Sequence, residues 1–111
     1  MILHDYFSSS GKNLILKYID NLTEDEQEDA HFVRKVMKEG RFEKISPKPW
    51  RGKIYEVYFR RYNRMFYVVI NSDIYILHAC KKQKNRTEKI DSDLILKRAR
   101  ELEQRFEKKF I

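Results

Sequence analysis

Three short runs of apolar and aromatic residues, separated by brief polar turns, constrain the fold of this chain more than any other feature. The runs are Ile54–Phe59, Met65–Ile70 and Ile74–Ala79, and the turns lie at Arg60–Arg64 and Asn71–Asp73. Connections this short join antiparallel neighbours in a sheet. Because Met65–Ile70 is apolar or aromatic throughout, we expect it to be the central strand, buried on both faces.

Helical periodicity is present on both sides of these strands. Lys12–Asn21 and Glu24–Glu39 carry apolar residues at the spacing of one helix face, and so does Ser92–Phe110. Thr23 and Glu26 form the pattern of a capping box, which marks the start of the second helix. The sequence therefore predicts a helical hairpin before the strands and a single helix after them.

These elements predict an α+β fold with a three-stranded antiparallel sheet and the helices on one face. Ile2–Phe7 is a candidate fourth strand, and Ser8–Ser10 offer caps for the first helix. Pro47 and Pro49 separate the helical region from the strands. With few glycines and prolines and no repeat, residues 1–111 are expected to form one domain.

Several classes of protein are excluded by what the sequence lacks. No apolar run reaches the length of about 18 residues that spans a membrane, and the N-terminus lacks the pattern of a signal peptide. A single cysteine, Cys80, forms no intramolecular disulfide and fits a reducing compartment. The three histidines show no metal-ligand spacing. We therefore expect a cytoplasmic protein without a metal or other cofactor.

The charge of the chain is concentrated in one region. The 24 basic and 17 acidic residues give a net charge of +7, and the segment Arg51–Arg86 alone holds nine basic and two acidic side chains. A basic segment interleaved with aromatic rings favours binding to a nucleic acid over a basic surface without a partner. Some of these rings, such as that of Tyr58, offer faces on which an unstacked base can lie.

Two basic clusters lie at strand ends. The first occupies the turn between the first two strands and consists of Arg60, Arg61 and Arg64; the second follows the third strand and consists of Lys81, Lys82, Lys84 and Arg86. In an antiparallel meander these two positions meet at the same edge of the sheet. Converging cations can hold a phosphate and stabilise the charge that builds on it during cleavage. His78, at the end of the third strand, is either an acid or base or a structural histidine.

The segments Gly52–Val57, Arg64–Tyr67 and Ile76–Lys82, in this order and spacing, resemble the RelE/HigB superfamily of bacterial toxins, and most closely its phage-derived RelE-like branch. The resemblance covers roughly residues 14–102. It implies a RelE/ParE-like fold and the toxin of a type II toxin–antitoxin pair. The implied activity is endonucleolytic cleavage of mRNA on the ribosome, without a metal, by attack of the ribose 2′-hydroxyl on the adjacent phosphate. The implied partners are mRNA on the ribosome and an antitoxin with a helix-turn-helix domain.

The resemblance also implies roles for individual residues. Arg64 and Lys82 would stabilise the phosphate, and Lys81 or Glu56 would accept the 2′-hydroxyl proton. The residues expected to hold RNA are Arg51, Lys53, Tyr58, Arg60, Arg61, Lys84 and Arg86. Tyr58 stands where the family usually has an arginine. Because no tyrosine follows Tyr75, the leaving group would take its proton from a lysine, His78 or solvent.

Two other functions remain compatible with this pattern. A ParE-like inhibitor of DNA gyrase would share the fold but would not need a phosphate-activating cluster. An inactive phage relative would bind RNA or protein without cleaving it. The convergence of Arg64 with the lysine pair favours the nuclease.

Overall fold

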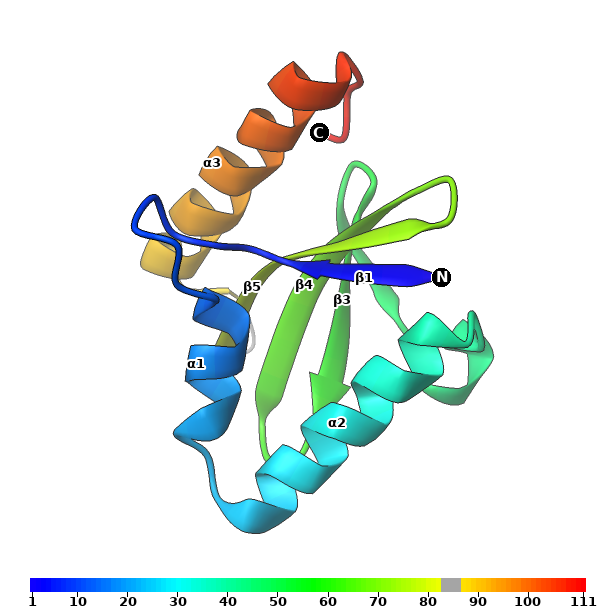
Figure 1. The fold of residues 1–111 in the computed structure, drawn as a ribbon, viewed down its shortest axis with the longest axis vertical. Coiled ribbons are helices and arrows are strands. Elements are labelled where there is room, and N and C mark those ends of the chain that lie inside the picture. The colour runs from blue at the N-terminus through cyan, green and yellow to red at the C-terminus, as the bar shows by residue number, and fades with distance from the viewer. Residues whose placement is uncertain (83–86) are drawn as a thin grey trace.

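The computed structural model describes residues 1–82 and 87–111, which form a five-stranded mixed sheet and three α-helices (Figure 1). The elements in chain order are β1 (Ile2–Asp5), α1 (Leu14–Asp20), α2 (Glu24–Lys38), a 3-10 turn (Phe42–Lys44), β2 (Lys48–Arg51), β3 (Ile54–Phe59), β4 (Asn63–Ile70), β5 (Asp73–Lys81) and α3 (Lys89–Phe106). The strand order across the sheet is β1-β5-β4-β3-β2. None of the helices in the described ranges has the length and apolar character of a membrane span.

The predicted antiparallel meander is confirmed in β3, β4 and β5. β4 lies in the middle of the sheet, and only Val69 of its eight residues is exposed. Its side chains alternate between two cores. Met65 and Tyr67 pack beneath α1 and α2, whereas Phe66 and Val68 pack beneath α3. The near-continuous apolar character of this strand therefore reflects burial on both faces.

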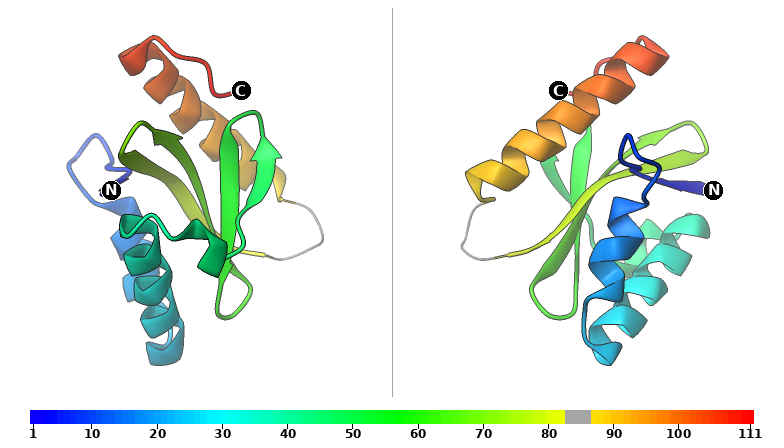
Figure 2. Two further views of the ribbon diagram at one scale, coloured as in Figure 1. Left: turned by 90° about the vertical axis from the view of Figure 1, so that its right-hand side faces the viewer. Right: turned by 60° about the vertical axis from the view of Figure 1, so that its left-hand side comes forward.

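The prediction that all helices cover one face of the sheet is wrong. α1 and α2 lie on one side and α3 lies on the other, as the two views of Figure 2 show. The apolar stripe of α3 includes Ile95, Ala99 and Leu102, which contact residues of the second core. A helix on each face is what a central strand with two buried faces requires, because either face left open would expose a hydrophobic surface.

Both outer strands differ from the predicted three-stranded antiparallel sheet. The candidate strand at the N-terminus is confirmed as β1, but it runs parallel to β5 and makes the sheet mixed. The sequence does not predict β2, because Pro47 and Pro49 indicate only an interruption between the helical region and the strands. Pro49 lies within β2, which is an edge strand. An edge strand tolerates proline because the missing N–H can face solvent.

Capping residues at the helix ends match some, but not all, of the caps that the sequence predicts. The capping box of Thr23 and Glu26 is confirmed at the start of α2. α1 is capped by the Asn13 side chain, which accepts hydrogen bonds from the backbone of Ile15 and Leu16, and not by the preceding serines. Gly40 follows α2 with a φ of 72°, a conformation that favours glycine.

Candidate functional site

The strand ends that carry the two basic clusters meet at one end of the sheet, as the sequence predicted, which brings the described residues Arg64, Lys81 and Lys82 to this end. Asn63 and Arg64 at the start of β4 lie opposite Lys81 and Cys80 at the end of β5. The backbone N–H of Lys82 donates to the carbonyl of Tyr62 at 2.5 Å, which joins the two segments directly. This contact follows from the antiparallel pairing of β4 and β5.

Arg64 is the most deeply buried cation of this region, with 2% of its surface exposed. Its Nη1 donates to Glu56 Oε2 and to the Thr87 hydroxyl, each at 3.1 Å. Its Nε and Nη2 have no hydrogen-bond partner within residues 1–82 and 87–111. A buried donor without a partner costs about 1–3 kcal/mol. Two donors of a guanidinium, a group that pairs well with closely spaced anionic oxygens such as those of a phosphate, are therefore unsatisfied in this buried position.

Further polar side chains surround Arg64 on the same face of the sheet. Tyr58 lies directly opposite Arg64 on β3, and its hydroxyl donates to Glu56 Oε1 at 3.3 Å. Two ammonium groups lie near the Tyr58 ring, because the Nζ atoms of Lys48 on β2 and of Lys82 after β5 are each 5.2 Å from its centroid. These five residues, Lys48, Glu56, Tyr58, Arg64 and Lys82, are called the Arg64 site below.

Lys48 is the member of the Arg64 site that sequence reasoning missed. It lies opposite Glu56 across the β2–β3 pair. The sequence signal for Lys48 as a site residue is weak, because the neighbouring prolines argue against a strand. Without a strand, the sequence does not indicate which face of the sheet Lys48 occupies. Thr87 was missed as well. Its hydroxyl accepts from both Trp50 Nε1 and Arg64 Nη1, at 3.1 Å each, and so fixes the orientation of the guanidinium.

Lys81 does not join Lys82 in the Arg64 site. β5 continues to Lys81, two residues beyond the predicted end, and consecutive side chains of a strand point to opposite faces. The Lys81 ammonium lies 2.6 Å from Glu26 Oε2 at the start of α2. That ammonium, followed by the Asn63 amide, holds the pKa of Glu26 well below its usual value of 4.5. The two adjacent lysines thus have different surroundings.

Glu26 also fixes the turn that carries the first basic cluster. Its Oε2 accepts from the Asn63 amide at 2.7 Å and from the backbone N–H of Arg61 at 3.3 Å. The side chains of Arg60 and Arg61 reach toward Asp25, with N–O distances of 3.7 and 3.5 Å, and are largely exposed. These two arginines therefore lie beside the start of α2, with their charge partly neutralised.

His78 is held at both ring nitrogens. Nδ1 lies 3.1 Å from Arg98 Nη1, which can only donate, so the ring proton is on Nε2, 2.7 Å from Asp91 Oδ1. Burial is the main cause of the lowered pKa of His78, which keeps the ring neutral at pH 7. This arrangement orients α3 against β5 and does not present a free acid or base.

His78, Cys80 and Asp91 also have potential metal-ligand atoms within 4.8 Å of one another. Two features disfavour a metal there. A neutral histidine that accepts at Nδ1 carries its proton on Nε2, so neither nitrogen has a free lone pair. Burial raises the pKa of the Cys80 thiol to about 12, which disfavours the thiolate that a metal would bind.

The remaining predicted RNA-binding residues lie elsewhere. Arg51 and Lys53 are exposed at the turn between β2 and β3, at the other end of β3 from the Arg60–Arg64 turn. The Arg51 guanidinium lies 5.0 Å from the Trp50 ring centroid. Lys84 and Arg86 lie outside the described residues. The RNA-binding roles of these residues, and the catalytic roles predicted for the others, remain predictions.

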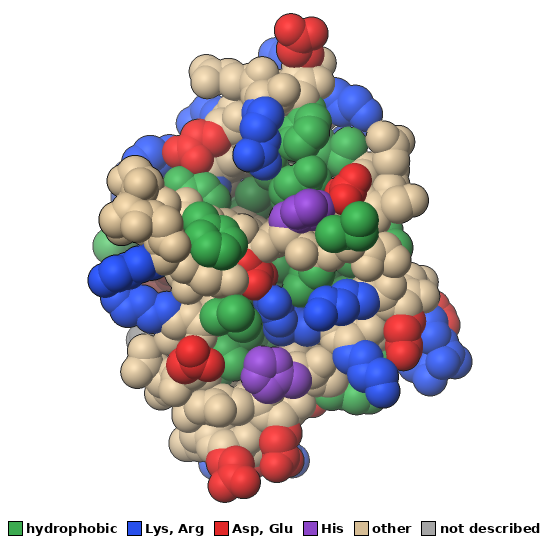
Figure 3. Space-filling view, viewed as in Figure 1, with side chains coloured by type: hydrophobic (Ala, Val, Ile, Leu, Met, Phe, Trp, Pro, Cys, Tyr) green, Lys and Arg blue, Asp and Glu red, His purple; other side chains and the backbone are tan. Residues whose placement is uncertain are grey.

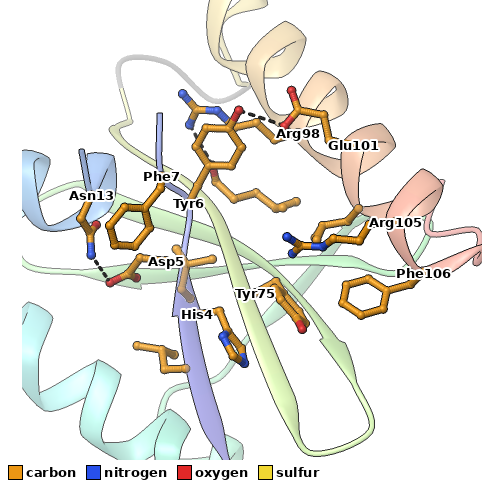
Figure 4. A pocket seen from close by; sticks show the side chains of 14 residues that line it. His4, Asp5, Tyr6, Phe7, Asn13, Tyr75, Arg98, Glu101, Arg105 and Phe106 are labelled. Atoms are coloured by element: carbon orange, nitrogen blue, oxygen red, sulfur yellow. Dashed lines mark hydrogen bonds between the residues drawn. The ribbon is translucent and has the colours of Figure 1, made fainter. Parts of the chain in front are cut away.

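A cavity of about 850 Å³ lies between the N-terminal segment, β5 and α3, away from the Arg64 site (Figure 4). On the face of the molecule that Figure 3 shows, hydrophobic side chains lie among charged ones. The charged groups that line the cavity are engaged within the fold. Arg98 donates to the Leu77 carbonyl and lies over the Tyr6 ring, and Asp5 pairs with Arg34. Among residues 1–82 and 87–111, no buried polar side-chain atom that lines this cavity is without a hydrogen-bond partner, in contrast to Arg64.

Comparison with known proteins supports one assignment. A family model described as phage-derived protein Gp49-like matches residues 13–100, which include the helical hairpin, β2 to β5 and most of α3. A comparison with curated proteins finds no significant match. The chain thus belongs to the phage-derived Gp49-like family, a family of RelE-like toxins in toxin–antitoxin systems.

Proposed function

We propose that this protein is a toxin that cleaves mRNA on the ribosome without a metal, by attack of a ribose 2′-hydroxyl on the adjacent phosphate. The observation that carries the proposal is the buried Arg64 guanidinium, whose Nε and Nη2 have no partner in the described part of the chain. Lys82 and Lys48 add positive charge beside it. Membership of the Gp49-like family supports the toxin assignment.

In this mechanism the Arg64 site binds the scissile phosphate and stabilises the transition state. Arg64 would donate from Nε and Nη2 to two phosphate oxygens, a fork that matches their spacing. As the 2′-oxygen attacks, negative charge increases on these oxygens, and a preorganised donor then stabilises the transition state more than the ground state. The Lys82 ammonium would contribute to the same effect from the end of β5.

The sequence left two candidates for the group that accepts the 2′-hydroxyl proton. Glu56 lies in the Arg64 site, whereas Lys81 lies on the other face and is bonded to Glu26. Because successive side chains of a strand point to opposite faces, Lys81 is directed away from a phosphate bound at Arg64. We therefore assign the base to Glu56 and assign Lys81 to the positioning of the Asn63–Arg64 turn through Glu26.

The proposal includes the partners that such an activity needs. mRNA on the ribosome is the substrate, which places the toxin in the cytoplasm. A cognate antitoxin with a helix-turn-helix domain is the inhibitor. Because the Arg64 site is cationic, we expect the antitoxin to cover it with an acidic segment.

The chemistry is tested with reporter mRNA in a translating extract. We expect the products to carry a 2′,3′-cyclic or 3′ phosphate, because the 2′-oxygen displaces the 5′-oxygen. An mRNA with a single 2′-deoxynucleotide on the 5′ side of the cleaved bond should bind the ribosome normally and remain intact at that bond. Primer extension locates the cut, and analysis of the product ends identifies the phosphate.

Two outcomes would contradict this proposal. Products with a 5′ phosphate, or cleavage of the 2′-deoxy substrate, would show that another nucleophile attacks. If the purified protein leaves mRNA intact but inhibits supercoiling by DNA gyrase, the ParE-like alternative is correct. A matched mRNA with the deoxynucleotide one position further along controls for the substitution itself.

The contribution of Lys48 and Lys82 to RNA binding is expected to appear in its salt dependence. Each phosphate contact to single-stranded RNA contributes about 0.7 to the slope of log K against log salt concentration, so the variant Lys48→Gln/Lys82→Gln should lower the slope by about 1.4. The matched control is Lys12→Gln/Lys17→Gln, which removes the same charge from two exposed lysines at α1 and should leave the slope unchanged. Fluorescence anisotropy with a short RNA measures both slopes. An unchanged slope in the first variant would exclude these two lysines from the RNA contact.

A further inference from the structure

We propose that Tyr58 is a catalytic residue that passes the proton of the attacking 2′-hydroxyl to Glu56. This inference rests on the proposed cleavage reaction and adds a residue that the sequence associated only with base stacking. It follows from three features of the Arg64 site: the position of Tyr58 opposite Arg64, the engagement of both Glu56 oxygens in hydrogen bonds, and the direction of the hydrogen bond between Tyr58 and Glu56.

Tyr58 is placed within reach of a phosphate bound to Arg64. The two residues form a cross-strand pair between β3 and β4, and the side chains of such a pair stand side by side on one face of the sheet. Tyr58 is only half-buried, whereas Arg64 and Glu56 are 2% and 8% exposed. The Tyr58 hydroxyl is therefore the more accessible oxygen of the Tyr58–Glu56 pair.

Glu56 by itself is poorly placed to meet the substrate. Its Oε2 accepts from Arg64 and its Oε1 accepts from the Tyr58 hydroxyl, so both oxygens are engaged within the site. In the Tyr58 hydrogen bond the phenolic proton is directed at Glu56, which leaves a lone pair on Tyr58 Oη free to accept another proton. The pair thus forms a path from the accessible surface to a buried carboxylate.

The proton transfer accompanies the formation of one bond to phosphorus and the breaking of another. The 2′-oxygen forms a bond to phosphorus while its proton moves to Tyr58 Oη and the phenolic proton moves to Glu56 Oε1. The bond between phosphorus and the 5′-oxygen breaks, and the 5′-oxygen takes a proton from water. Glu56 then returns its proton through Tyr58 to water.

The test is single-turnover cleavage of ribosome-bound mRNA by Tyr58→Phe. Phenylalanine retains the ring near the two lysines and removes only the hydroxyl, so ribosome binding and the melting temperature should stay close to wild type. Cleavage should slow by about 100-fold or more, the usual contribution of proton transfer in a transition state. The matched control is Tyr55→Phe, the same change on the same strand but on the opposite face, where Tyr55 stacks on Tyr67. Its rate should equal that of wild type.

A double-variant comparison separates a proton path from a purely structural hydrogen bond. Glu56→Gln keeps a side chain of the same size but cannot accept the proton. If Tyr58 and Glu56 act in one path, Tyr58→Phe/Glu56→Gln should be no slower than the slower single variant, because groups that act as a unit are strongly non-additive.

The outcomes distinguish this inference from the proposed function. If the wild-type protein cleaves mRNA and Tyr58→Phe cleaves it at the same rate, the role of Tyr58 is overturned and the nuclease assignment stays intact. A slower rate explained by lost ribosome binding would also overturn it. Absence of cleavage by the wild-type protein would instead remove the proposed function on which the inference rests.

Discussion

Replacing Arg64 with lysine is expected to slow mRNA cleavage by about 100-fold or more while the protein still folds. Lysine keeps a positive charge next to Glu56, so the buried carboxylate is not left without a partner. It loses the planar fork that presents Nε and Nη2 to two oxygens at once. A loss of this size is typical when one preorganised donor to a developing oxyanion is removed. Single-turnover cleavage of ribosome-bound mRNA measures the effect.

The matched control for this prediction is Arg61→Lys. Arg61 lies three residues earlier, is largely exposed and interacts with Asp25. The loss of cleavage rate in Arg61→Lys should therefore be at least tenfold smaller than the loss in Arg64→Lys. Arg64→Ala is a less informative variant, because it removes the partner of a buried carboxylate and so lowers stability as well. Undiminished cleavage by Arg64→Lys would show that the guanidinium does not bind the scissile phosphate.

Replacing Glu26 with alanine is expected to lower the free energy of unfolding by about 3 kcal/mol. About 1 kcal/mol comes from the capping-box hydrogen bond that Glu26 Oε1 accepts from the backbone N–H of Thr23. The remainder comes from the charged hydrogen bonds to Lys81 and Asn63, which are worth about 1.5–3 kcal/mol. Urea denaturation measures the change. The matched control is Glu28→Ala, an exposed glutamate of the same helix, which should change stability by less than about 0.5 kcal/mol.

The effect of Glu26 on stability should depend on pH with a definite sign. Its pKa is lowered in the folded protein, so the folded state favours the ionised carboxylate. The contribution is therefore complete above the unfolded pKa of 4.5 and decreases as the pH falls below it. The stability difference between wild type and Glu26→Gln should be constant from pH 6 to 7 and shrink below about pH 4. A difference that grows on acidification would contradict the proposed ion pair.

The sequence alone determined the features that depend on neighbouring residues. The capping box of Thr23 and Glu26 is a local signal, and so are the short turns that force β3, β4 and β5 into a meander. From that meander it follows that Arg64 and the end of β5 lie at the same end of the sheet. The apolar character of Met65–Ile70 likewise indicated burial on both faces, because each face of a strand takes every second residue.

The tertiary structure decided which residues share a face and which segment pairs at an edge. Lys81 and Lys82 are adjacent in the sequence, but the extension of β5 by two residues places Lys81 beside Glu26 and Lys82 beside Tyr58. Lys48 joins the Arg64 site only because β2 pairs with β3 despite its proline. Strand pairing and helix docking bring together residues far apart in the chain, so their free energy depends on the whole sheet and leaves little trace in local sequence.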